Sequence, residues 1–272
     1  MAYGFKNFGQ VAGHTPLSIR TIIDGTTLEN RFNTDAFRFT TLTVSGRGSA
    51  EYRVESTDVY GRPGSLLRER SISNRHFVIR AKVKADTNEN YRKGMSALNA
   101  LFYMDDVQRL EFTDDNGYGY YGTCQRIQDE GEESNTQIIE IEFLVTDPFK
   151  YTNVKTHSTV NAKNIEVDSD FPIVAEEIAI TFDTAAKARD FTLNNTSTGL
   201  RIRYQQSNTA SGTTIKIRQK EDYIGYVNTI NYFKDVNIRF SHLDEFTVAN
   251  GDQLVVTPAP VSIQIKYRGV RL

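Results

Sequence analysis

Strict alternation of apolar and polar residues is the feature that most constrains the fold of this chain. It is clearest in residues 77–84 and again in residues 139–145. Such a period of two is typical of strands with one buried face. The polar face is positive in the first segment and negative in the second, and opposite charges on neighbouring strands contribute about 0.2–1 kcal/mol per pair. We therefore predict that the two strands lie together in one sheet, although two separate solvated faces fit the pattern equally well. The apolar positions are Phe77, Ile79, Ala81, Val83, Ile139, Ile141, Phe143 and Val145.

One segment, residues 88–103, has the pattern of a helix. Asp86 and Glu89 are spaced like the first and last positions of a capping box. A single apolar stripe follows at helical spacing, and two aspartates at 105 and 106, unfavourable at a helix C-terminus, end it near Tyr103. We expect this helix to pack on the sheet. The stripe consists of Tyr91, Met95, Leu98, Leu101 and Phe102.

A β-hairpin is predicted directly after the helix, from residues 107–112 and 118–123. The intervening Asp114–Gly117 contains Asn-Gly, the strongest short hairpin signal. The acidic residues of this turn could also suggest a calcium loop. The ligand spacing and distal glutamate of such a loop are absent, so the turn is the better interpretation.

The strand pattern ends at Asp147–Tyr151, because proline cannot donate to a β-ladder. A polar stretch follows to about residue 170, and we place a domain boundary here, giving domains of residues 1–150 and 151–272. The second domain reads as short strands about ten residues apart, which indicates a β-sandwich or jelly roll. Its predicted strands contain Ile178, Ile180 and Phe182; Leu200, Ile202 and Tyr204; Ile215 and Ile217; Ile238 and Phe240; and Val261, Ile263, Ile265 and Tyr267. Its predicted turns contain Asn194-Asn195, Ser211-Gly212 and Asn250-Gly251-Asp252.

Composition argues against most chemistry. Cys124 is the single cysteine, and the four histidines are scattered, so we predict no disulfide, metal site or cofactor. No nucleophile motif or paired catalytic carboxylates can be recognised, which predicts a non-enzyme. The formal net charge of −2 argues against tight nucleic-acid binding. No apolar run could span a membrane and no secretory signal is present, so we expect synthesis in a cytoplasm.

Charge is unevenly distributed along the chain. Residues 61–93 contain nine Lys or Arg and three acids, whereas residues 105–147 contain twelve acids and two basic residues. The two blocks could neutralise each other within one domain, or they could form a head-to-tail interface of the kind that closes rings. For the second case the candidate ring contacts are Arg62, Arg68, Arg70, Asp129, Glu130, Glu132 and Glu133.

Sugar binding is the alternative function, because β-sandwiches often carry it. The chain has 14 tyrosines that could stack on sugar rings, but it has no tryptophan. Tyr223, Tyr226 and Tyr232 are the best candidates for sugar or partner contacts, and core or interface roles are the plainer explanation. In this reading the chain would be an adhesin module that recognises the bacterial surface.

Several motifs in a fixed order resemble one family. In the first half they are Phe37–Gly48, Val59–Leu67, Leu110–Asp114 with Tyr120–Gly122, and Asp147–Tyr151, and they bracket the single helix. In the second half they are Asn194–Gly199, Phe240–Leu243 and Asn250–Asp252. The chain resembles the distal tail proteins, called Dit, of long-tailed, non-contractile bacteriophages.

The resemblance implies a mainly β protein that forms the hub of a phage tail tip or baseplate. It implies an N-terminal tail-tube-like β-barrel or sandwich domain with one helix, and a C-terminal galectin-like β-sandwich. The first domain would form a hexameric ring between the major tail tube protein and the tail-associated tip protein, around a channel through which DNA passes without specific binding. The second would carry receptor-binding or other peripheral baseplate proteins. The implied location is the virion tail tip, after synthesis in the bacterial host.

Overall fold

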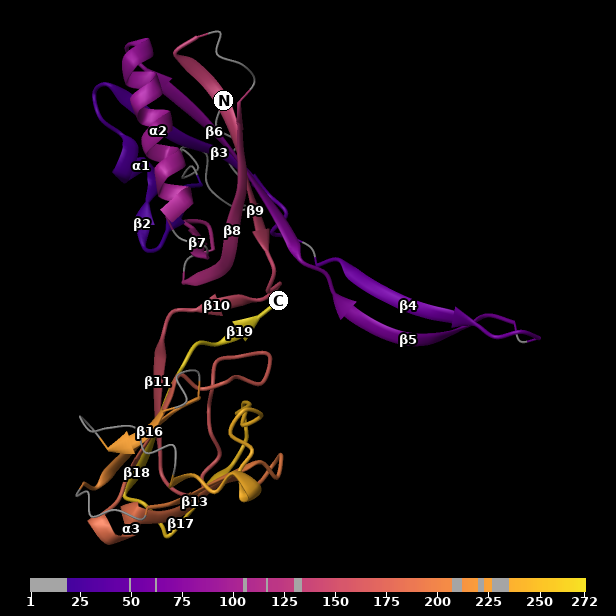
Figure 1. The fold of residues 1–272 in the computed structure, drawn as a ribbon, viewed down its shortest axis with the longest axis vertical. Coiled ribbons are helices and arrows are strands. Elements are labelled where there is room, and N and C mark those ends of the chain that lie inside the picture. The colour runs from indigo at the N-terminus through magenta and orange to yellow at the C-terminus, as the bar shows by residue number, and fades with distance from the viewer. Residues whose placement is uncertain are drawn as a thin grey trace, which may run out of the picture. The chain divides into compact units, whose positions relative to one another are not determined.

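The computed structural model describes residues 19–48, 50–61, 63–104, 107–115, 117–129, 134–206, 212–219, 223–226 and 235–272. The fold is mainly β, and its sheets are antiparallel. The chain divides into two compact units: one extends to Lys150 and includes Leu272, and the other comprises Tyr151–Arg271. The two units are described in turn (Figure 1).

The first unit is built on one antiparallel sheet in the order β2-β1-β7-β8-β9-β6-β3, with a separate hairpin, β4–β5. Its strands are β1 (Thr21–Ile23), β2 (Thr26–Thr27), β3 (Phe37–Ser45), β4 (Tyr52–Asp58), β5 (Ser65–Ile72), β6 (Arg75–Ala85), β7 (Gln108–Phe112), β8 (Tyr118–Asp129) and β9 (Thr136–Val145). Its helices are α1 (Leu28–Phe32) and α2 (Asn88–Met104).

Strands β6 and β9 confirm the pairing predicted from their opposite charges. They are adjacent and antiparallel, with Arg80 opposite Glu140 and Ile79 opposite Ile141. The guanidinium of Arg80 lies 3.0 Å from the Glu140 carboxylate on the outer face. The alternating apolar side chains of both strands are completely buried on the other face, as the period of two predicts.

Helix α2 covers the buried face of this sheet, and the prediction of its capping residue was wrong. The backbone N–H of Asn90 donates to Oγ1 of Thr87 at 3.2 Å, so Thr87 caps the helix in place of Asp86. Asp86 instead accepts a bond from the Asn90 side chain. At Gly94 the helix approaches β3 so closely that a Cβ atom would lie 2.2 Å from the ring of Phe37.

The predicted hairpin after α2 is present as β7 and β8, and β8 continues six residues beyond the predicted strand end, to Asp129. Gly117 adopts φ +89°, the left-handed conformation that the turn requires. Asp114 and Asp115 form ion pairs with Arg47 and Lys150 at 2.7 and 3.1 Å. These cations account for the acidic character of the turn.

The short helix α1, which the sequence pattern does not indicate, protects the outer edge of β3. The backbone N–H of Phe39 donates to Oδ1 of Asn33 at 2.6 Å, and that of Thr41 donates to Oε1 of Glu29 at 3.0 Å. Side chains thus occupy donors that an edge strand would otherwise present to another chain.

The second unit is a β-sandwich. Its sheets have the orders β11-β18-β12-β15-β16 and β14-β13-β17, and side chains from both form one core that includes Ile178, Ile180, Phe191 and Leu193. The strands are β10 (Lys150–Thr152), β11 (Lys155–Thr159), β12 (Glu177–Thr181), β13 (Asp190–Asn195), β14 (Arg201–Gln205), β15 (Thr214–Arg218), β16 (Tyr223–Tyr226), β17 (Leu254–Thr257), β18 (Ser262–Tyr267) and β19 (Val270–Arg271), and the helices are α3 (Ala185–Arg189) and the 3₁₀-helix η3 (Ile238–Phe240).

Two local predictions in this unit were wrong. Ile238 and Phe240 do not lie on a strand: they form η3, with side chains 74% and 47% exposed. Asn194 and Asn195 end strand β13 and do not lie in the turn. Asn195 is fully buried, and its amide donates to Oδ2 of Asp252 at 2.7 Å. This bond offsets the cost of burying the amide, and its acceptor is too distant in sequence to be inferred from local composition.

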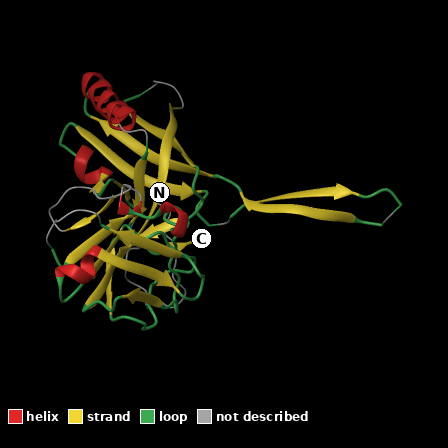
Figure 2. Cartoon of the chain, turned by 60° about the horizontal axis from the view of Figure 1, so that its bottom comes forward, coloured by secondary structure: helices red, strands yellow, loops and turns green. Residues whose placement is uncertain are grey.

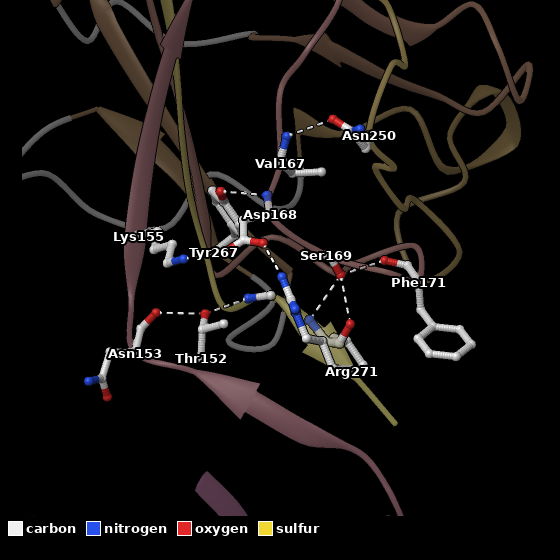
Figure 3. Close-up of polar contacts among 12 residues, drawn as sticks. Thr152, Asn153, Lys155, Val167, Asp168, Ser169, Phe171, Asn250, Tyr267 and Arg271 are labelled. Atoms are coloured by element: carbon white, nitrogen blue, oxygen red, sulfur yellow. Dashed lines mark hydrogen bonds and ion pairs between the residues drawn. The ribbon is translucent and has the colours of Figure 1, made fainter. Parts of the chain in front are cut away.

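A polar cluster holds the C-terminal strand β19 to the rest of the second unit (Figure 3). Asp168 accepts bonds from Lys155 and, at 2.5 Å, from Arg271. The hydroxyl of Tyr267 accepts the backbone N–H of Asp168, and the hydroxyl of Ser169 donates to the carbonyl of Phe171. The Lys155 and Arg271 side chains keep the pKa of Asp168 below its ordinary value.

Candidate oligomerisation surface

The hairpin β4–β5 is the most distinctive surface of the first unit. It extends away from the sheet that contains β3 and β6, and its strands of seven and eight residues pair with each other and with no third strand among the described residues. Figure 2 shows this separation from a second direction. A two-stranded hairpin is marginally stable alone in water, because it lacks a third element on which to bury a face. A further element that covered one face would stabilise it.

One face of the hairpin carries three exposed apolar side chains beside Arg70. Pairing of Val54 with Arg70 and of Ser56 with Leu67 places Tyr52, Val54 and Leu67 on the same side. These three apolar side chains are 45%, 57% and 64% exposed. Exposed apolar side chains that gather on one face mark an interaction surface more often than scattered single ones do.

Charges are distributed over both faces of the hairpin. Arg53 pairs with Glu55 at 2.6 Å, and both side chains are well exposed. The guanidinium of Arg70 stacks over the ring of Tyr52, 4.2 Å from its centroid. Arg68 lies at the irregularity of β5 and forms no ion pair with any residue that the structure describes.

The base of the hairpin is anchored firmly. Arg75, only 6% exposed, donates to the carbonyl oxygens of Pro148 at 2.7 Å and of Arg47 at 2.9 Å. Arg47 in turn makes two bonds of 2.8 and 2.7 Å to Asp114 and lies over the ring of Phe112. The Arg47 hydrogen bonds lower the pKa of Asp114 from its ordinary value. The exposed strands are thus attached to a rigid base.

The candidate ring contacts fall into two places. Arg68 and Arg70 lie on β5, and Asp129 lies at the end of β8. No ion pair joins these three residues to one another in the described ranges. The remaining candidates, Arg62, Glu130, Glu132 and Glu133, lie outside the described residues. Their role in a ring stays a prediction.

The candidate sugar contacts are not tested. Tyr223 and Tyr226 lie on β16, which pairs with β15 in the second unit. The structure does not describe their side chains. Tyr232 lies outside the described residues altogether. The adhesin hypothesis therefore stays a prediction.

Groups able to perform chemistry are sparse in the parts of the chain that the structure describes. No three His, Cys, Asp or Glu residues there are placed to hold a metal ion. Burial raises the pKa of the Cys124 thiol to about 11, so the reactive thiolate is scarce at neutral pH. No described helix is long and apolar enough to cross a bilayer.

The sequence patterns identified the cations of the hairpin and missed its apolar face. Tyr52 and Val54 alternate with Arg53 and Glu55, a signal that predicts a half-buried strand. The pattern could not indicate that the face would lack a covering element in its own unit. Only the strand pairing reveals this.

Known proteins with related sequence and structure are phage tail components. Residues 23–145 match the family model of the phage tail protein RIFT-related domain. The Dit protein of phage SPP1, described as a hub of the adsorption apparatus in phages that infect Gram-positive bacteria, superposes with a TM-score of 0.75 at 18% identity, over 93% of this chain and 99% of that one. No curated protein sequence matches.

Chains of the phage P2 baseplate in its activated conformation are also similar. With Ca the TM-score is 0.53 at 12% identity, over 85% of this chain and 90% of that one. With Sr it is 0.54 at 14% identity, over 92% and 97%. These findings confirm the resemblance predicted from the sequence motifs. The first unit is thus similar to the phage tail protein RIFT-related domain, and the chain as a whole has the fold of a phage distal tail protein.

Proposed function

We propose that this protein is the structural hub of a phage tail tip or baseplate. In this role it forms a hexameric ring that joins the major tail tube protein to the tail-associated tip protein, and DNA leaves through the central channel without specific binding. Its place is the virion tail tip. The similarity of 93% of the chain to a phage hub protein supports this assignment.

A single observation carries the proposal: a firmly based hairpin with an exposed apolar face projects from a domain of the phage tail family. Such a face is costly for a protein that acts alone, since it favours association and yields no stability in the monomer. In a hub the face is buried against a neighbour. Structural proteins that assemble by shared surfaces require no reacting group.

The second unit supports a docking role. It is a separate β-sandwich with its own core, so it can carry receptor-binding or other peripheral baseplate proteins without disturbing a ring built from the first unit. We assign it no catalytic role.

Native mass spectrometry tests the proposal, with the protein alone and then mixed with the tube protein or the tip protein. A closed oligomer, six copies in the hexameric case, is the expected result in at least one mixture. Negative-stain images should show rings with a central opening. A protein that stays monomeric at high concentration with both partners would contradict the hub assignment.

A further inference from the structure

The face of the first sheet that points away from α2 carries a group of cations at one end. Arg38 of β3 lies directly opposite Lys84 of β6, and Lys82 lies two residues before Lys84 on the same strand. Because alternate residues of a strand share a face, the three side chains point to the same side, and all are exposed. We call these three residues the cationic face. The residues between them and beside them point the other way and are buried: Phe37, Phe39, Ala81, Val83 and Ala85.

The charges of the cationic face are not neutralised within the described part of the chain. Further along β6, Arg80 pairs with Glu140 of β9 at 3.0 Å. The β9 residues opposite the two lysines are instead Ile138 and Thr136, which carry no charge. No member of the cationic face forms an ion pair with a residue that the structure describes.

The opposition of Arg38 and Lys84 is costly for the protein alone. Like charges directly opposite each other on adjacent strands destabilise a sheet, and here two cations meet in that position. An anion bound across the pair would replace their repulsion with attraction. The arrangement therefore favours a negatively charged ligand from outside the chain.

The composition of this face favours nucleic acid over an acidic protein. Protein interfaces are depleted in Lys and have an apolar core, whereas the apolar residues on this side of β6 and β9, Val78, Ile138 and Leu144, are all partly buried. Duplex DNA carries one negative charge per roughly 1.7 Å of its axis. Cations about 5–7 Å apart on a sheet can therefore each meet a phosphate. A flat face places no element in a groove of the duplex, so such a contact positions the DNA without reading its bases.

We infer that the cationic face contacts the phosphate backbone of duplex DNA, weakly and independently of sequence. Three phosphate contacts on a chain with a net charge of −2 give a low affinity, which suits DNA that must move past and leave. The inference rests on the proposed hub function, which brings DNA to the protein, and it names the surface that faces the DNA.

Salt-dependent binding of the full chain to a labelled duplex tests this contact. Fluorescence anisotropy with a duplex of about 20 base pairs gives the slope of log affinity against log salt, and each phosphate contact contributes about −0.9 to that slope. Lys82→Gln with Lys84→Gln should therefore reduce the magnitude of the slope by about 1.8. Arg92→Gln with Lys93→Gln is the matched control, because both residues are exposed on α2, on the other side of the sheet, and their loss changes the net charge equally. The control should keep the parent slope.

Two duplexes of unrelated sequence and a polyglutamate peptide of the same charge complete the experiment. The duplexes should bind with the same affinity, and the peptide about tenfold more weakly because its charge is less dense. No binding of DNA at low salt, or equal slopes for the two double variants, would overturn the inference. A peptide that binds as tightly as DNA would also overturn it and would identify an acidic protein as the partner.

Assembly is measured separately by native mass spectrometry, so the two proposals fail independently. Rings that form while the double variants have equal salt slopes would overturn the DNA contact and leave the hub function intact. A reduced slope for the double lysine variant without rings in any mixture would contradict the hub function and leave the DNA contact standing.

The melting temperature in the absence of DNA gives a second readout. Lys84→Gln removes the repulsion of Arg38, so its melting temperature should equal or exceed that of the parent chain. Lys93→Gln is the control, and it should melt slightly lower because Lys93 pairs with Glu89 at 2.7 Å. A lower melting temperature for Lys84→Gln would show that Lys84 stabilises the fold by itself and would count against a role in binding an anion.

Discussion

Strand β6 and the hairpin β4–β5 are neighbours in the sequence, and β6 and β4 both alternate apolar with polar residues, yet they end in opposite environments. The apolar residues Phe77, Ile79, Ala81 and Val83 of β6 are completely buried beneath α2 and the adjacent strands. Val54 and Leu67 of the hairpin are more than half exposed. The alternation therefore indicates which face of a strand is apolar and gains stability when it is covered. What covers it, an element of the same chain or another molecule, is decided by topology.

The largest expected difference is in the free energy of unfolding. Phe77→Ala removes a fully buried ring that contacts Tyr120 edge-on at 4.8 Å between centroids, so the free energy of unfolding of the monomer should fall by about 3–5 kcal/mol. Leu67→Ala should change it by less than about 0.5 kcal/mol, because that side chain packs on little in the monomer. Urea titration followed by circular dichroism measures both. A large loss with Leu67→Ala would show that the hairpin is covered within its own chain.

Secondary-structure elements could be predicted from the sequence where their signals lie within a few residues, and not where they depend on contacts distant in the sequence. The alternation in β6 and β9, the apolar stripe of α2 and the Asn-Gly turn identify their elements because each signal lies within a few residues. Ile238–Phe240 has the same kind of apolar spacing as a strand, yet it forms a 3₁₀-helix whose N–H groups bond three residues back.

The same distinction applies to the candidate surface. The charge blocks, which are visible in one dimension, proposed Arg68, Arg70 and Asp129 as ring contacts, and this stays a prediction. They could not show that β8 continues beyond the residues that pair with β7. The pairing of segments far apart in sequence determines this, and no local pattern encodes it.

A smaller effect is expected where α2 covers the sheet. Gly94→Ala places a Cβ against the Phe37 ring, where 2.2 Å is available, and relieving this overlap should cost about 1–3 kcal/mol despite the better helix propensity of alanine. Adding Phe37→Leu should recover part of the loss, which a double-mutant cycle measures. Ser96→Ala, at an exposed position of the same helix, is the control. If the effects of the two substitutions on the free energy of unfolding were additive, α2 and β3 would move apart without cost to relieve the overlap.

The base of the hairpin offers a test with a pH signature. The bond from Arg47 holds the pKa of Asp114 below its ordinary value of 3.8. A lowered folded-state pKa stabilises the protein above the unfolded value, and this stability is lost as the pH falls through the folded value. Asp114→Asn should therefore lower the free energy of unfolding by about 1 kcal/mol at neutral pH. The two proteins should converge as the pH falls below this ordinary value and through the lowered pKa of the folded protein. A difference that persists unchanged in acid would mean that the carboxylate charge is not responsible.

The smallest expected effect lies on the outer face of β6, where this buried strand resembles the hairpin. Arg80 and Glu140 form a cross-strand ion pair whose side chains are 46% and 39% exposed. Solvent screens such pairs, so a double-mutant cycle to alanine should give a coupling free energy of about 0.2–1 kcal/mol, smaller at high salt. Lys84 is the matched control, since it lies opposite Thr136, four residues along β9 from Glu140, and should show no coupling to Glu140. A coupling well above 1 kcal/mol would indicate that this face is shielded from water, and a shielded outer face would remove the contrast between the two sides of β6.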